Sequence, residues 1–207
     1  MMQRQRVTYL AASWCLGYPD EELLERMPLI RSALAEFNGL DRSFGDVLNA
    51  LTAKPLAEVQ AWYVQEFDLS KRHALHLSYW TDGDTRRRGE VLIGFKQVYR
   101  NSGMLVNTHG ELPDYLPMVL EFAATVDLAA GRELLTRYRP SLEMLRLALV
   151  DDSLPHAQVL QAICDTLPGA SPTDRQQVMK MAGYGPPTES VGLEPYDPRL
   201  LPMQGGQ

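Results

Sequence analysis

The sequence contains few cysteines and no long apolar run, and each absence excludes a class of protein. Its 207 residues include two cysteines, Cys15 and Cys164, which form no CxxC pair and lie in no cluster of histidine and cysteine. This pattern excludes a disulfide framework and a structural zinc site, and it predicts buried free thiols. Because no apolar segment approaches the roughly 18 residues of a membrane-spanning helix, we expect a soluble protein. The basic N-terminal segment, interrupted by Trp14 and Tyr18, is a poor export signal, so we expect a cytoplasmic protein.

The sequence also lacks the motifs of the common enzyme classes. It has no GxGxxG after a strand, no Walker-type loop, no GxSxG and no HExxH. His73 and His76 are three residues apart and could share a helix face, but no carboxylate lies at the matching turn. The net charge of −6 argues against nonspecific binding to nucleic acid. We therefore predict no cofactor, no metal site and no nucleic-acid partner.

What the sequence does contain is helical periodicity over most of its length. Apolar residues recur at spacings of three and four, and alternating patterns rich in valine, isoleucine and threonine are missing. The fold is predicted to be all-α, a single-domain helical bundle over residues 1–182. Asp20 is expected to cap the second helix. The first predicted helix ends at Gly17. The others span about 20–37, 43–53, 55–68, 117–130, 131–138, 140–150, 156–167 and 173–182, together with a helix that has a core stripe from Val91 to Tyr99 and is closed by Gly103.

The composition changes at residue 183. The last 25 residues hold five glycines and five prolines, which is too many helix breakers for a further helix. We predict a Pro/Gly-rich mobile tail over 183–207. Apolar residues nevertheless occur between 191 and 203. One hypothesis is that this segment docks weakly on the body of the protein, and the alternative is that it has no role.

A proline-bounded segment, ELPDYLP at 111–117, interrupts the helical pattern. Its prolines fix the backbone locally and bias the preceding residues, Leu112 and Leu116, away from helical geometry. A helix is predicted to begin at Pro117, because a proline at the first helical position loses no hydrogen bond. Asp114 is then not required as the cap of that helix.

Three features in fixed order are more specific than any one of them. They are Tyr63-x-x-x-Phe67-Asp68, Gly83-Asp84-x-Arg86-x-Arg88-Gly89, and Glu111-Leu112-Pro113-Asp114-x-Leu116-Pro117. On a helical chain, they resemble the nitrate reductase molybdenum cofactor assembly chaperones, the nitrate reductase delta-subunit (NarJ) family. The resemblance is strongest over 61–124 and is weaker through the end of the first helix, at 16–20. Many members of that family have a histidine where this sequence has Tyr115.

The resemblance implies a binding protein rather than an enzyme. Members of the family are all-helical cytoplasmic proteins related to the twin-arginine redox-enzyme maturation chaperones. They bind the apo catalytic alpha subunit of respiratory nitrate reductase, partly through its N-terminal segment. They hold this subunit while the molybdenum cofactor is inserted and before it docks on the membrane. We therefore expect the apo alpha subunit as the partner and no direct insertion into the membrane. The resemblance does not indicate an oligomeric state.

A groove between helices is the expected site for such a client segment. An amphipathic peptide with basic residues would lay its apolar face into the groove, with acids at the rim to steer it. The candidate client-binding residues are the acids Asp68, Glu111 and Asp114 and the apolar wall Tyr63, Phe67 and Tyr115. Asp114 could instead form a hydrogen bond at the start of a helix. Tyr63 and Phe67 could instead be core residues.

Two other functions stay open from the sequence. The first is a maturation chaperone for another molybdenum enzyme, such as a dimethyl sulfoxide or trimethylamine oxide reductase. The second is an all-helical enzyme whose site has no known motif, although the sequence offers no coherent set of acid, base or metal ligand. The identity of the co-purifying client would separate these functions.

Overall fold

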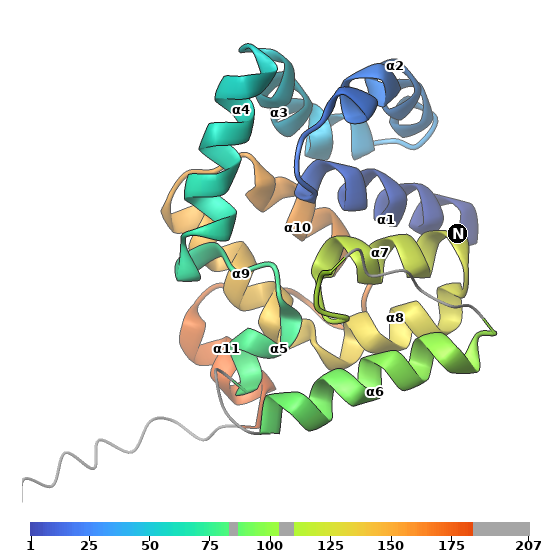
Figure 1. Ribbon diagram of the computed structural model, residues 1–207. Coiled ribbons are helices and arrows are strands. Elements are labelled where there is room, and N and C mark those ends of the chain that lie inside the picture. The colour runs from blue at the N-terminus through green and yellow to red at the C-terminus, as the bar shows by residue number, and fades with distance from the viewer. Residues whose placement is uncertain (83–86, 104–109, 184–207) are drawn as a thin grey trace, which may run out of the picture.

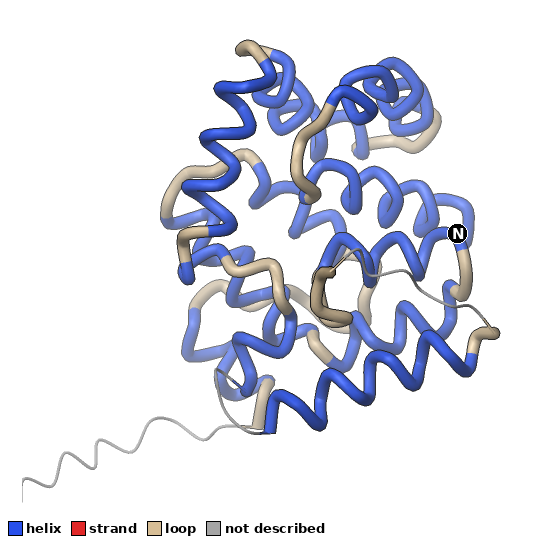
Figure 2. The backbone as a smooth tube through the Cα atoms, in the orientation of Figure 1, coloured by secondary structure: helices blue, strands red, loops and turns tan. Residues whose placement is uncertain are grey.

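The computed structural model describes residues 1–82, 87–103 and 110–183, and this part of the chain is all-helical, as predicted (Figure 1). One isolated bridge pairs His76 with Tyr115, and the described residues form no strand (Figure 2). The α-helices are α1 (Met2–Leu16), α2 (Glu21–Ala35), α3 (Leu40–Thr52), α4 (Leu56–Tyr63), α5 (Leu77–Asp82), α6 (Arg87–Asn101), α7 (Leu116–Thr125), α8 (Leu128–Arg137), α9 (Arg139–Asp151), α10 (His156–Cys164) and α11 (Arg175–Met181). A π-helix, η1 (Val64–Asp68), follows α4, and a 3-10 helix, η2 (Lys71–His73), precedes α5. Within the described ranges, no helix has both the length and the apolar character needed to span a bilayer.

The first helix, α1, packs against α7, α10 and α2 (Figure 1). Buried residues from α1 to α10 form one continuous hydrophobic core. Tyr9 and Leu16 of α1, Phe44 of α3 and Leu120 of α7 are fully buried in it. The long helix α6 lies along the edge of the bundle and buries Phe95 and Tyr99. The helices from α1 to α10 therefore share one core.

Aspartate caps determine where three of the helices begin. The carboxylates of Asp20, Asp127 and Asp174 each accept a hydrogen bond from the backbone N–H three residues later. The cap at Asp20 was predicted. The cap at Asp127 corrects the prediction of one helix over 117–130, because α7 ends at Thr125 and α8 begins at Leu128. Pro117 is the second residue of α7, one position from its predicted place.

The helix predicted over 55–68 changes its winding at Tyr63. α4 ends there, and the chain continues as the π-helix η1, in which the Leu69 N–H donates to the Val64 carbonyl at 2.9 Å. Tyr63 and Phe67 remain on one face, with ring centroids 4.9 Å apart. π-turns inside helices are rare and frequently mark functional sites.

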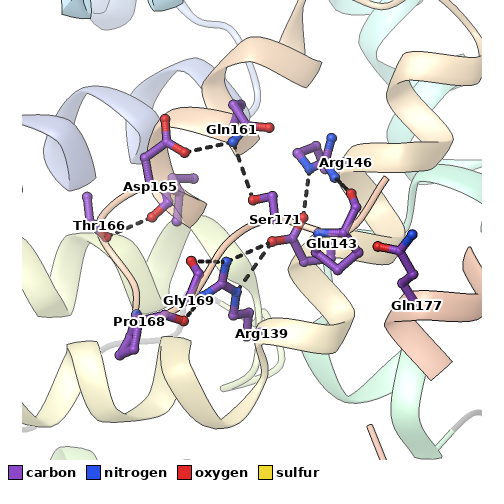
Figure 3. Close-up of polar contacts among 12 residues, drawn as sticks. Arg139, Glu143, Arg146, Gln161, Asp165, Thr166, Pro168, Gly169, Ser171 and Gln177 are labelled. Carbon is purple, nitrogen blue, oxygen red and sulfur yellow. Dashed lines mark hydrogen bonds and ion pairs between the residues drawn. The ribbon is translucent and has the colours of Figure 1, made fainter. Parts of the chain in front are cut away.

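A buried ionic network joins α9 to the segment before α11 (Figure 3). Glu143 is fully buried, and its carboxylate accepts hydrogen bonds from Arg139 at 3.3 Å and from Arg146 at 2.7 Å. Arg139 also donates to the carbonyl oxygens of Pro168 and Gly169. These bonds satisfy buried charges and hold the loop that leads to α11 against the bundle.

The predicted tail, 183–207, lies outside the described residues from position 184 onward. The predicted domain limit at 182 falls one residue after the end of α11 at Met181. The segments 83–86 and 104–109 also lie outside the described residues, so Gly83, Asp84 and Arg86 of the second motif have no structural account.

Candidate functional site

The proline-bounded segment is paired with the chain just before α5. The Leu77 N–H donates to the Asp114 carbonyl at 3.1 Å, and the Leu116 N–H donates to the Leu75 carbonyl at 2.8 Å. These two bonds flank the isolated antiparallel bridge between His76 and Tyr115. Within the segment, Pro113 and Asp114 form a turn that is closed by a hydrogen bond from the Tyr115 N–H to the Leu112 carbonyl at 3.0 Å, and this turn brings Tyr115 opposite His76.

Asp114 lies beneath this bridge and is fully buried. Its Oδ2 accepts hydrogen bonds from the Ser78 N–H at 3.0 Å and the Ser78 hydroxyl at 2.5 Å. Arg88 of α6 lies 3.8 Å from the same oxygen and donates to the Ser78 hydroxyl at 3.1 Å. His76 Nδ1 is 3.5 Å from Oδ1. Burial by itself raises the pKa of Asp114, but the nearby His76 and the hydrogen bonds from Ser78 outweigh it and leave the pKa below its ordinary value. Asp114 therefore anchors the start of α5.

Three tyrosines hold the same segment in place. The Tyr63 hydroxyl donates to the Leu16 carbonyl at 2.9 Å, at the end of α1. Because a tyrosine has one hydroxyl proton, Tyr115 then donates to the Tyr63 oxygen at 3.1 Å. Tyr99 of α6 donates to the Pro113 carbonyl at 2.7 Å. The ends of α1 and α4 and the helix α6 thus all meet at the proline-bounded segment.

Beside this junction lies a groove of about 280 Å³, which we call the motif groove. Its lining residues come from η1, η2, α5, α6 and the proline-bounded segment: Phe67, Asp68, Ser70, Lys71, Ala74, Leu75, His76, Tyr79, Arg88, Glu111 and Tyr115.

The motif groove combines an apolar floor with a charged rim. Phe67 and Leu75 are buried, whereas Asp68 and Glu111 are exposed. Burial raises the pKa of Tyr115 to about 12; the hydrogen bond with Tyr63 opposes this shift, and the two rim acids add to it. Partial burial likewise raises the pKa of Asp68, and His76 opposes that shift. The two acids therefore act electrostatically on the same aromatic wall.

Exposed apolar side chains adjoin both rim acids in the sequence. Leu69 follows Asp68 and is 67% exposed, and Leu112 follows Glu111 and is 39% exposed. Large exposed apolar residues that flank a groove are typical of a surface that binds another molecule. Leu69 and Leu112 therefore add exposed apolar area next to the two acids, while Lys71 and Arg88 make the charge of the groove lining mixed in sign.

The structure brings four of the six predicted residues together and gives the other two internal positions. Phe67, Asp68, Glu111 and Tyr115 line the motif groove. Tyr63 is only 2% exposed and forms its hydrogen bonds within the core, which agrees with the alternative prediction for it. The expectation that Asp114 is an acid at the rim is wrong for this structure, because its carboxylate is fully buried and caps α5.

Sequence reasoning missed part of the site. Ser78 and His76 contact Asp114, but no sequence signal connects either of them with a residue 36 or 38 positions away. Arg88 could have been predicted as a site residue, because it belongs to the second motif. His73 and His76, once considered as a metal pair, have different partners, since His73 contacts Asp152 and Glu66.

The fold and the sequence both have known counterparts. A protein assigned to redox enzyme maturation from Archaeoglobus fulgidus has a similar crystal structure, with a TM-score of 0.56 over 78% of this chain and 92% of that chain. The two sequences are 21% identical, so this likeness concerns the fold alone. A family model described as "Nitrate reductase delta subunit" matches residues 30–160, which include all three motifs. The chain belongs to the nitrate reductase delta subunit family, and the resemblance in the motifs is confirmed.

Curated relatives agree with this family. A protein of Bacillus subtilis (strain 168), named as a nitrate reductase molybdenum cofactor assembly chaperone, NarJ, is 31% identical over 79% of this chain and 89% of its own length. NarJ of Escherichia coli (strain K12) is 29% identical over 67% of this chain. The nitrate reductase-like protein NarX of Mycobacterium tuberculosis is 41% identical over 77% of this chain, but the match spans only 24% of that longer protein. The names of the two NarJ relatives agree with the prediction of a chaperone rather than an enzyme.

Proposed function

We propose that the protein is an assembly chaperone that binds the apo catalytic alpha subunit of a nitrate reductase in the cytoplasm and assists insertion of its molybdenum cofactor. The observation that carries this proposal is the convergence of the family's motifs on one groove. Residues from all three motifs line it: Phe67 and Asp68, then Arg88, then Glu111 and Tyr115. The names of the NarJ relatives support a nitrate reductase as the client.

The groove suits the N-terminal segment of the client as a short amphipathic peptide. Its floor offers Phe67 and Leu75 for apolar side chains, and its rim offers Asp68 and Glu111 for basic ones. Such a peptide orders on binding, so its affinity falls well below the sum of its contacts. We expect a dissociation constant that is roughly micromolar or tighter.

Calorimetry tests the proposal with a synthetic peptide that copies the N-terminus of the cognate alpha subunit. A double charge reversal, Asp68→Lys with Glu111→Lys, is expected to weaken binding about tenfold at low salt and less at high salt, because rim charges are screened. The control is Asp46→Lys, which reverses the charge of one exposed acid of α3 outside the groove and is compared with each of the two reversals made singly. No binding by the natural protein, or equal weakening by the control, would contradict the proposal.

The same assay separates clients. Peptides from the N-termini of other molybdenum reductases, measured under identical conditions, are expected to bind at least tenfold more weakly than the nitrate reductase peptide. Stronger binding of one of them would reassign the client while leaving the groove in place.

A further inference from the structure

We infer that a segment of the tail, residues 199–203, occupies the motif groove when the client is absent and is displaced when the client binds. The inference rests on the proposed function only in that the client uses the same groove. In this inference, the groove binds a segment of the same chain, and that segment competes with the client for the groove.

The first support is the chemistry of the groove. Its rim carries the exposed acids Asp68 and Glu111 and the exposed Lys71, Arg88 also lines it, and its floor is built from Phe67 and Leu75. The neighbouring Leu69 is 67% exposed. A segment that binds beside the two acids therefore has a basic side chain next to apolar ones.

The second support is the sequence of the tail. Arg199 is the single basic residue after position 183, and Leu200 and Leu201 follow it directly. Met203 adds a further apolar side chain, and Pro202 restricts the backbone between them. Segments without a binding role usually contain few large apolar residues. The run Arg-Leu-Leu-Pro-Met thus has the basic and apolar pattern that the groove accepts.

The third support is where the described chain ends. Gly183 follows α11, which packs on α9. α5 packs on the same helix and supplies Tyr79 to the groove. Residues 184–198 lie between Gly183 and Arg199 and can span up to roughly 50 Å when extended. A folded body of this size has a radius of gyration of about 16 Å, so the reach of the tail does not limit docking.

Tethering makes even weak docking effective. A flexible connection of this length gives the segment a local concentration on the order of 1 mM. If the free segment binds the groove with a dissociation constant of about 0.1–1 mM, it occupies half or more of the grooves. Client affinity then falls by the fraction covered, which corresponds to about twofold to tenfold.

The test uses the full chain with a nitroxide spin label at Gln204→Cys. The two native cysteines are buried, and burial raises the thiol pKa of Cys15 to about 12, so the label is expected only at the new thiol. We expect line broadening of the backbone amides at 68–76 and 110–115, with the amides of α2 as the reference. The variant Arg199→Glu with Leu200→Ser and Leu201→Ser is expected to lose this broadening.

A second measurement connects docking with the client. The client peptide is expected to bind the triple variant about twofold to tenfold more tightly than it binds the natural chain, with an unchanged melting temperature. The matched control is Val191→Ser with Leu193→Ser, which removes apolar residues from the tail outside 199–203 and is expected to leave broadening and affinity unchanged. In the labelled natural chain, saturating peptide is expected to remove the broadening.

The outcomes separate this inference from the proposed function. Broadening at the groove without client binding would support the docked tail and sink the proposed function. Client binding without broadening, or with equal affinity for the triple variant, would overturn the inference and leave the proposed function intact. A further sample mixes two chains: one carries the isotope label for detection but no spin label, and the other carries only the spin label. Broadening in this mixture would show that the tail of a second copy occupies the groove, which would also overturn the inference.

Discussion

The substitution Asp114→Asn tests whether the proline-bounded segment acts through structure or through direct contact with a client. Asp114 is fully buried, and it accepts two hydrogen bonds from Ser78 and lies 3.8 Å from Arg88. Asparagine has nearly the same shape, so the change removes the negative charge without creating a cavity. One of its carbonyl lone pairs can still accept from the Ser78 N–H.

The expected loss of stability follows from these contacts. The bond from the Ser78 hydroxyl at 2.5 Å is charge-assisted, and replacing such a bond costs about 1.5–3 kcal/mol. Loss of the ion pair between Asp114 and Arg88 lowers the free energy of unfolding further. This contribution is smaller than the full cost of breaking a buried ion pair, because the arginine side chain is 17% exposed. We therefore expect a loss of about 2–3 kcal/mol in the free energy of unfolding. For a domain of this size, that loss lowers the melting temperature by roughly 5–10 °C.

The dependence on pH gives an independent check. The pKa of Asp114 in the folded protein is below its ordinary value, because the nearby His76 and the hydrogen bonds from Ser78 outweigh the effect of burial. The charged form therefore stabilises the fold above the unfolded pKa of about 3.9, and this stabilisation is lost as the pH falls through the lower folded pKa. The natural protein and the Asp114→Asn variant should differ most near pH 7 and converge in acid.

Urea unfolding followed by circular dichroism and tryptophan fluorescence measures the effect, with Asp46→Asn on the surface of α3 as the control. The control is expected to remain within about 0.5 kcal/mol of the natural protein. Client binding should weaken only in proportion to the loss of folded protein. A variant with unchanged stability but binding weakened by about 1–3 kcal/mol would show instead that Asp114 reaches the client.

Three further predictions concern the core. Glu143→Gln is expected to cost about 3–5 kcal/mol of unfolding free energy in urea melts, because it leaves two buried arginines without their carboxylate; a change below 1 kcal/mol would contradict this. Gly131→Ala should lower stability by about 1–3 kcal/mol, since the new Cβ would lie 2.3 Å from the Ala123 Cβ, and equal stability would refute the close packing of α7 on α8. Cys15 and Cys164 should react with a thiol reagent only after unfolding, because both are buried; rapid labelling of the native protein would contradict their burial.

Local patterns determined most of the secondary structure. Apolar spacing predicted the helical class, and the Asp20 cap predicted the start of α2, because both signals act over one or two turns. The helix break at Asp127 was missed, although an aspartate can cap a helix at any suitable position. Apolar periodicity continued across this break, so the local pattern did not reveal it.

For the candidate site, too, the sequence predicted some features and missed others. The motifs by themselves pointed to Phe67, Asp68, Glu111 and Tyr115, which do line one groove. Whether Asp114 faces solvent or the interior could not be read from ELPDYLP, because the polarity of a residue does not determine which partners fold onto it.

Only the tertiary structure decided the roles of the residues around Asp114. The sequence by itself determined a helical chain interrupted by a stiff, proline-bounded segment, since proline geometry is local. The pairing of this segment with the chain before α5 joins residues almost 40 positions apart, and it brings Ser78 beneath the Asp114 carboxylate. Contacts between residues so far apart in the sequence depend on how all the helices pack. Closing the loop between them costs conformational entropy, and only the packing of the assembled core offsets this cost.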